Sequence, residues 1–481
     1  MKRALLSTIS AFVLLAAGCT VGPKYKKPPV AMTPAYKEPP PDSFKEGQGW
    51  KTADPGDQKL KGKWWEIFGD PQLNQLEEEL TISNETLKVA EARFRQARAQ
   101  IRFNRAAQFP TISTSPGISS LRDSAHRPYF TSATSATGDF ILPFDLSYEI
   151  DLWGRVRRTV AAAREEAQAT AADLETASLS LHAELAMDYF ELRSADAQKK
   201  LLDDTIQAYA DSLRLTETRF EGGVAPKADV AQARTQLEQT QVQDTDVGVQ
   251  RSEFEHAIAV LIGKPPASFG LNLSPLDLKP PTIPVGVPSQ LLERRADIAS
   301  AERRTAEANE QIGIAKAAYY PTVTLSATAG FEGTGILNWL TWPSRFWAVG
   351  PQMLETIFDA GRRKATSEQV LAGYDAAVAT YRQTTLNAFQ DVEDNLAALR
   401  ILEKEADQQK AAVDSAKESL QLATNRYTGG LDNYLSVLAA QAIALFNERN
   451  EVDILRRRMD ASVLLVKAVG GGWDVSELPE F

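Results

Sequence analysis

The sequence predicts a mainly α-helical protein in which long helical hairpins are combined with a few β-strands that cross a membrane. Residues 362–428 contain no proline and a single glycine, and apolar side chains recur there every three or four positions, as in one long helix. Other segments alternate apolar and polar residues, as strands do. Several motifs recur 207 residues apart, which indicates an internal duplication.

The chain begins with the pattern of a secretory signal peptide, predicted over residues 1–18. Two basic residues precede an apolar run from Ala4 to Ala17, which is shorter than the about 20 residues that span a bilayer. Cys19, the only cysteine, follows small residues, and this resembles the bacterial lipoprotein cleavage box, in which the cysteine carries palmitate and other acyl chains. The alternative is ordinary cleavage with Cys19 as a spare thiol. Thr20 replaces the aspartate that retains lipoproteins at the inner membrane, so the resemblance implies an outer-membrane anchor.

Residues 19–63 are predicted to form an extended arm, because they contain eight prolines and no helical or strand periodicity. A flexible tether and an arm that follows the protein surface are both consistent with this composition.

The duplication predicts two copies of one unit, residues 64–264 and 289–473, joined by a proline-rich linker at 265–288 and followed by a tail at 474–481. Each copy is expected to run helix, strand pair, long helix, turn, long helix. The matching motifs are Arg219 to Val224 with Arg426 to Leu431, Gly154-Arg155 with Gly361-Arg362, and Phe109 to Thr111 with Tyr320 to Thr322.

Four strands are predicted, near 111–121, 139–152, 322–331 and 345–357. From Phe140 to Leu152, seven apolar residues alternate with mostly polar ones, which is typical of a membrane strand with a lipid-facing and a water-facing side. A half-buried sheet of a soluble protein is the alternative. Tryptophans fit an interfacial belt at Trp153, Trp339, Trp342 and Trp347. A closed membrane barrel needs at least eight strands, so four per chain require oligomerisation, and three copies give twelve.

Composition excludes several other functions. The 53 basic and 63 acidic residues give a net charge of −10, so no nucleic-acid partner is expected. One cysteine and three widely spaced histidines predict no disulfide, no metal site and no cofactor beyond the lipid on Cys19. No catalytic motif of a hydrolase, metalloprotease or phosphate-binding enzyme is present, so the chain is not expected to be an enzyme.

Four motifs resemble those of one bacterial family. They are Trp64 to Leu73, Glu149 to Arg155, Arg294 to Ile298, and the terminal Gly470 to Trp473. In this order and spacing the chain resembles the TolC-like outer-membrane factors, of the NodT/OprM type of efflux lipoprotein. One departure is Ala296, where the family usually has proline.

The resemblance implies a homotrimer with a twelve-stranded barrel in the outer-membrane lipid and a helical tunnel in the periplasm. It also implies a passive exit channel of a tripartite efflux system, with a periplasmic membrane-fusion adaptor and an inner-membrane RND-type pump, as in multidrug resistance. The exported compound, a drug, a metal or another small molecule, is not specified by the sequence. The alternative function is a periplasmic coiled-coil lipoprotein that acts as a scaffold or adaptor without a pore.

The resemblance also implies a gate near two glycine turns, which end one helix and begin the next. The expected adaptor contacts are at Gly222, Gly223, Val224, Gly429, Gly430 and Leu431. In the gate, Asp229 matches a family aspartate and Tyr427 its tyrosine partner.

Two positions that are acidic in well-known members carry Ser436 and Ala439 here, so a double acidic ring is not expected. Asp432 is either a single acidic ring or a helix N-cap. Arg219 and Arg426 either favour the helix dipole or join the gate.

Overall fold

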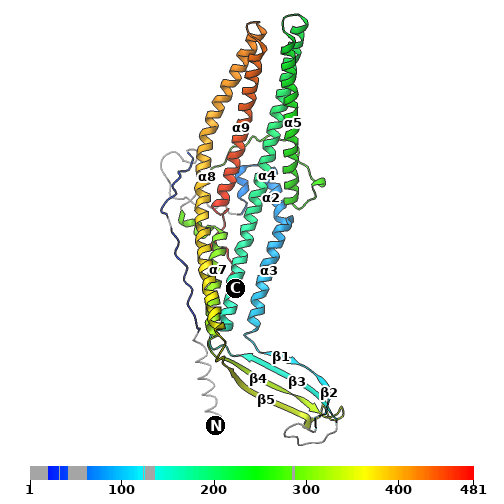
Figure 1. Cartoon of the computed structure of the whole chain (residues 1–481), viewed down its shortest axis with the longest axis vertical. Helices are drawn as coiled ribbons and strands as arrows, with labels where there is room; N and C mark the ends of the chain where they lie inside the picture. The colour runs from blue at the N-terminus through cyan, green and yellow to red at the C-terminus, as the bar shows by residue number, and fades with distance from the viewer. Residues whose placement is uncertain (1–19, 32, 42–61, 123, 125–135, 284–287) are drawn as a thin grey trace.

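The computed structural model describes residues 20–31, 33–41, 62–122, 124, 136–283 and 288–481. The predicted signal peptide, Cys19 and residues 42–61 of the predicted arm lie outside this part of the chain. In the described part, two long helical hairpins extend from one end of a small sheet (Figure 1). The mainly helical class with a minor set of strands is therefore confirmed.

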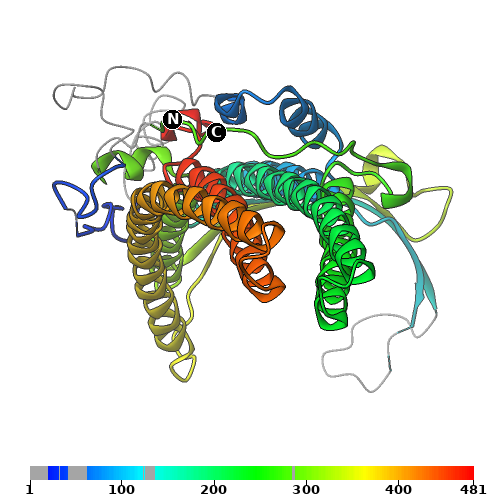
Figure 2. The ribbon, with the colours of Figure 1, turned by 90° about the horizontal axis from the view of Figure 1, so that it is seen from above.

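Each hairpin pairs a helix of 67 residues with one of 35 residues. The first consists of α4 (Arg155–Glu221) and α5 (Lys227–Leu261), and the second of α8 (Arg362–Thr428) and α9 (Tyr434–Ala468). At 1.5 Å per residue, each longer helix reaches on the order of 100 Å. Seen along their axes, the four helices form a curved row rather than a closed bundle (Figure 2).

Shorter elements pack beside these hairpins. The α-helices are α2 (Pro71–Ser83), α3 (Glu85–Ala106), α6 (Leu291–Arg294) and α7 (Ala296–Ala317). The short 3₁₀ turns are η3 (Trp64–Phe68), η4 (Pro266–Ser268), η5 (Pro288–Gln290), η6 (Trp342–Ser344) and η7 (Val475–Glu477). Within the described ranges, no helix combines the length and the apolar character needed to cross a membrane.

The sheet is antiparallel and joins the two repeats. Its strands are β1 (Thr111–Thr114), β2 (Gly117–Leu121), β3 (Thr137–Glu149), β4 (Thr322–Gly333) and β5 (Arg345–Leu354). The order is β1-β3-β4-β5, and β2 pairs with β3 further along the same side as β1. The region predicted as one strand at 111–121 is therefore two, and the break contains Pro116, which has no N–H to donate to the ladder.

The main hydrophobic core lies midway along the molecule, where α2 and η3 pack against α4 and α9. Trp64, Trp65 and Phe68 are buried in it. Asp70 caps α2 by accepting the N–H groups of Gln72 and Leu73. The conspicuous tryptophan motif therefore attaches the start of the first repeat to the long helices.

A buried polar pair also lies in this region. Nδ1 of His182 is 2.6 Å from Oε2 of Glu77, the ring of Trp65 stacks on that of His182, and both members of the pair are buried. Burial raises the pKa of Glu77 and lowers the pKa of His182 to about 4.

The described part of the arm follows the protein surface. Figure 1 shows it beside α7 and α8. The backbone N–H of Val21 donates to the carbonyl of Trp153 at 3.0 Å, the Tyr25 hydroxyl donates to Glu302 at 2.6 Å, and Glu38 pairs with Arg400 at 2.6 Å. For residues 20–31 and 33–41, the flexible-tether interpretation is therefore wrong.

Candidate transport path and gate

The two faces of the sheet differ in chemistry, most clearly along β3 and β4. Cross-strand partners share a face, and the register links Phe144 to Ala329 and Ala329 to Trp347. One face is therefore almost entirely apolar, with Ile112, Ile118, Phe140, Leu142, Phe144, Leu146, Tyr148, Leu325, Ala327, Ala329, Phe331, Trp347, Val349 and Met353. The other face is mixed. It carries the polar residues Ser113, Ser119, Asp139, Asp145, Ser147, Glu149, Thr324, Ser326, Thr328, Glu332 and Gln352 together with the apolar residues Leu121, Ile141, Pro143, Phe346, Ala348 and Leu354.

This arrangement fits a strand set with lipid on one side and water on the other. Many of the apolar side chains are exposed in the single chain, among them Ile112, Ile118, Trp347, Val349 and Met353. A half-buried sheet of a soluble protein would cover its apolar face with another layer. Among the described residues no helix covers this face, as Figure 1 shows.

The opposite end of the molecule is formed by the two glycine turns (Figure 1). Their backbones match bond for bond, because the N–H of Val224 donates to the carbonyl of Arg219 at 2.8 Å and the N–H of Leu431 donates to that of Arg426 at 2.9 Å. Gly223 and Gly430 have φ of 70° and 72°, the left-handed region that favours glycine. The side chains of Val224 and Leu431 project into solvent and are 67% and 77% exposed.

Arg219 connects the two hairpins near these turns. Its Nη1 donates to the carbonyl of Thr428 at 3.0 Å, and its guanidinium lies 4.8 Å from the centre of the Tyr427 ring. Two interpretations were open for Arg219, a favourable interaction with the helix dipole and a place in the gate. The structure places Arg219 in contact with Tyr427, a predicted gate residue. It also lies in the last turn of α4, where a positive charge is favourable.

The structure does not join Asp229 to Tyr427 by a hydrogen bond. The Tyr427 hydroxyl is buried and has no hydrogen-bond partner in the described part of the chain. Burial raises the pKa of the Asp229 carboxyl, and the charge of Arg219 acts in the opposite direction. Within one described chain, Arg219 interacts with both residues, and the pairing of Asp229 with Tyr427 in the gate stays a prediction.

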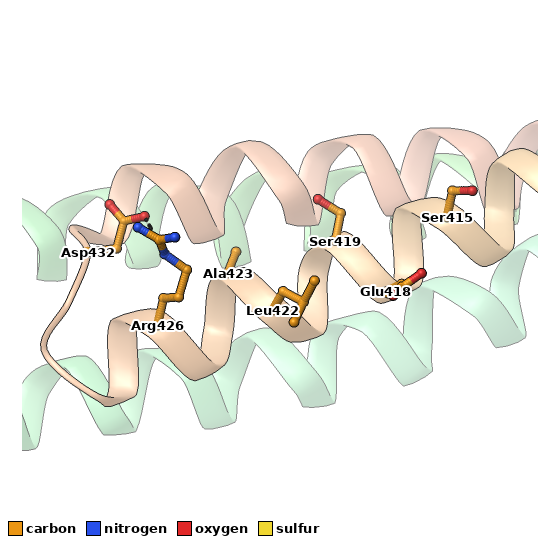
Figure 3. Close-up of a pocket in the computed structure, with 7 residues that line it drawn as sticks. All are labelled: Ser415, Glu418, Ser419, Leu422, Ala423, Arg426 and Asp432. Carbon is orange, nitrogen blue, oxygen red and sulfur yellow. Dashed lines mark ion pairs between the residues drawn. The ribbon is translucent and has the colours of Figure 1, made fainter.

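Asp432 and Arg426 come together just before α9 (Figure 3), and Ser436 in the first turn of α9 bonds to Asp432. Asp432 pairs with Arg426 at 3.4 Å and accepts hydrogen bonds from the N–H of Asn433 and the hydroxyl of Ser436. These interactions, led by that of the Asn433 N–H, lower the pKa of Asp432. The N-cap itself is Asn433, which accepts from the N–H of Ser436, so the N-cap prediction for Asp432 is wrong by one residue.

A depression runs along this part of the second hairpin and is lined by Ser415, Glu418, Ser419, Leu422, Ala423, Arg426 and Asp432 (Figure 3). It lies open on the hairpin surface, and Figure 3 shows Arg426 and Asp432 facing each other at its end nearest the turn.

Tyr434 is a residue of this region that the sequence analysis missed. It is buried, its ring lies 5.4 Å from that of Tyr427, and its hydroxyl is 3.2 Å from Oγ of Ser212 on α4. The residue 207 positions earlier, in the first copy, is Lys227, so the two copies differ at this position.

Comparisons with known proteins agree with this geometry. The family model described as outer membrane efflux protein matches residues 76–264 and 287–471. The solvent efflux pump outer membrane protein SrpC of Pseudomonas putida is 32% identical over 97% of this chain and 98% of its own length. The pyoverdine export outer membrane protein OpmQ of Pseudomonas aeruginosa is 31% identical over 85% of this chain and 87% of its own. The crystal structure of the Campylobacter jejuni CmeC outer membrane channel superposes with a TM-score of 0.88 at 25% identity, covering 95% of this chain and 96% of that one.

Proposed function

This chain belongs to the outer membrane efflux protein family and is an outer-membrane efflux channel, and from that premise we propose that three copies form the exit duct of a tripartite system with a periplasmic adaptor and an RND-type pump. The family supports a channel rather than a scaffold or adaptor without a pore. Its role is transport, in which the chain supplies a passage for solutes.

The observation that carries this proposal is a two-faced sheet with open edges. One edge is β5, and the other is formed by β1 and β2 in succession. Unpaired strand edges are not tolerated in lipid, so the apolar face can meet lipid only if the edges close on other copies. Each copy is four strands wide, and three copies exceed the minimum of eight strands for a closed membrane barrel.

The curved row of helices supports the same assembly. A row that bends in one direction is a segment of a tube wall (Figure 2). Three such segments around one axis give a tunnel that continues the mixed face of the sheet toward the periplasm.

We place the resting gate at the tips of the hairpins. Arg219 holds the end of α4 to the end of α8, and the Arg426–Asp432 pair fixes the second turn. A closed state persists only through contacts that the open state lacks. Docking of an adaptor on Gly222, Gly223 and Val224 and on Gly429, Gly430 and Leu431 would compete with these contacts.

Lipidation of Cys19 is part of the proposal. Thr20, the next residue, contacts Gly154 where the sheet meets α4, and the N–H of Val21 bonds to Trp153. An acyl anchor at Cys19 would therefore enter the membrane at the level where the sheet begins.

The proposed substrates are compounds of the kinds for which two relatives are named, solvents and pyoverdine. SrpC belongs to a solvent pump and OpmQ to pyoverdine export. The polar side chains on the mixed face of the sheet suit a water-filled passage, and selection is assigned to the pump.

Ion conductance of the purified full-length protein in planar bilayers tests the proposal. We expect discrete conductance steps and a trimer by sedimentation in detergent. A protein that is monomeric and conducts no ions would match the scaffold alternative instead.

A further inference from the structure

The loop between β4 and β5 exposes an unusual amount of apolar surface. Ile336, Leu337, Leu340 and Trp342 are 71%, 95%, 62% and 73% exposed. They are close together in a segment that joins β4 to β5 at the end of the sheet farthest from the helices (Figure 1). Such clustering on an exposed surface usually marks a contact with another molecule or with lipid.

The loop is folded toward the apolar face of the sheet. The ring of Trp339 packs on that of Phe140, with centroids 5.8 Å apart. Phe140 belongs to the apolar face, because it alternates with Leu142 and Phe144 along β3. The loop is thus held on the side of the sheet that faces lipid rather than on the side that faces the water-filled passage.

Arg345 places a positive charge on this same apolar side. It is the first residue of β5 and the cross-strand partner of Phe331. Its guanidinium lies 4.2 Å from the centre of the Trp342 ring, and its Nη1 donates to the Trp342 carbonyl at 2.8 Å. No carboxylate in the described part of the chain forms an ion pair with it.

A second arginine lies at the same end of the sheet. Arg122 directly follows β2, is exposed, and belongs to the edge opposite to β5. When the edges of neighbouring copies meet, as the proposed function requires, Arg122 of one copy and Arg345 of the next lie at the same end of the interface between them. A charge at a lipid-facing surface is costly unless an opposite charge compensates for it.

We propose that Arg345 and the loop 334–344 form a binding site for a phosphorylated, acylated lipid of the outer leaflet. The planar guanidinium, held by Trp342, is suited to bind a phosphate through two N–H donors. The apolar loop residues contact the acyl chains, and Arg122 of the neighbouring copy adds charge. This inference rests on the proposed function, because it uses the orientation of the sheet in the membrane.

The test measures lipid binding by the full-length trimer in neutral detergent, using native mass spectrometry. The probe is bis-phosphorylated lipid A, and the control lipid is the same molecule without its phosphates. We expect the wild type to bind the phosphorylated lipid at least several-fold more tightly. Arg345→Gln should weaken this binding roughly tenfold, as for the loss of a charged hydrogen bond, and Arg345→Lys should lose less.

Arg98→Gln is the matched control. Arg98 is an exposed arginine that also lies over an aromatic ring, that of Phe94, but on α3 away from the sheet. It should leave lipid binding unchanged, and Leu337→Ser should weaken binding of both lipids. Equal binding of the two lipids by the wild type, or equal binding by wild type and Arg345→Gln, would overturn the proposal. Conductance measured in parallel separates this outcome from a failure of the channel function.

Discussion

At the scale of single residues, Arg219 is one of the links between the two hairpins. Its hydrogen bond to Thr428 and its position over Tyr427 are each worth about 1 kcal/mol. Arg219→Gln should therefore favour the open channel roughly thirtyfold, since the two contacts together are worth about 2 kcal/mol and about 1.4 kcal/mol changes a population tenfold. The measurement is the conductance of the unstimulated channel in planar bilayers.

Arg214→Gln is the control for this prediction, because Arg214 is exposed on the same helix and pairs with Asp211 one turn away. It should leave the resting conductance unchanged. An unchanged conductance in Arg219→Gln as well would place the gate elsewhere.

The pair of Glu77 and His182 predicts a pH dependence of stability. Burial raises the pKa of Glu77 above its usual 4.5 and lowers the pKa of His182 from 6.5 to about 4. The contribution of Glu77 to stability is present below pH 4.5 and is lost as the pH rises toward its raised folded pKa, by up to about 1.4 kcal/mol per unit. The contribution of His182 is present above pH 6.5 and is lost as the pH falls from 6.5 to about 4, so the two effects oppose each other between pH 4.5 and 6.5.

Glu77→Gln replaces the titratable carboxyl by an amide of the same shape, so that this position no longer binds or releases a proton. Thermal unfolding at pH 6 and pH 8 should show a smaller loss on raising the pH in the variant than in the wild type. Identical losses would mean that other groups cause the dependence.

At the scale of elements, α4 and α7 approach each other closely at a glycine. A Cβ on Gly313 would lie 2.3 Å from the side chain of Arg158, which is buried and holds both Glu310 and the arm carbonyl of Pro23. Gly313→Ala should cost about 1–3 kcal/mol and release the arm. Limited proteolysis should then cut the arm faster than in the wild type.

Gly373→Ala is the matched helical control, since a Cβ there meets nothing within 4 Å. It should be neutral or stabilising by up to about 1 kcal/mol. If both variants are equally resistant to proteolysis, the close approach does not hold the arm.

The elements show how far the sequence predicts this structure. The limits of α8 follow from an unbroken helical stripe, and the alternation on β3 follows from its own residues, so both were predictable. The split at Pro116 and the pairing of β3 with β4 depend on segments far apart in the chain. The role of Arg219 was open for the same reason, because Thr428 lies 209 residues away and only the packing of two hairpins brings them together.

At the scale of the whole molecule, the open edges of the sheet predict where copies meet. Trp347→Cys on β5, combined in turn with cysteines at Ile112, Thr114, Ile118 and Ser120, should yield disulfide-linked trimers on a denaturing gel. In this series, Trp347→Cys combined with Phe144→Cys should give none, because Phe144 is on β3, between other strands of its own copy. A cross-link in the control, or none in the four pairs, would contradict edge-to-edge closure.

The two hairpins of one chain are equal in length, and this determines how many similar tips a trimer presents. Helices of 67 and 35 residues occur in both repeats, with turns that match bond for bond. In a trimer the tips would therefore present six nearly equivalent hairpins, although the chain is present only three times. A partner that recognises one turn finds a second in the same chain, so the rim has quasi-sixfold symmetry while the barrel at the other end is threefold. The differences between Lys227 and Tyr434 then distinguish alternate positions around that rim.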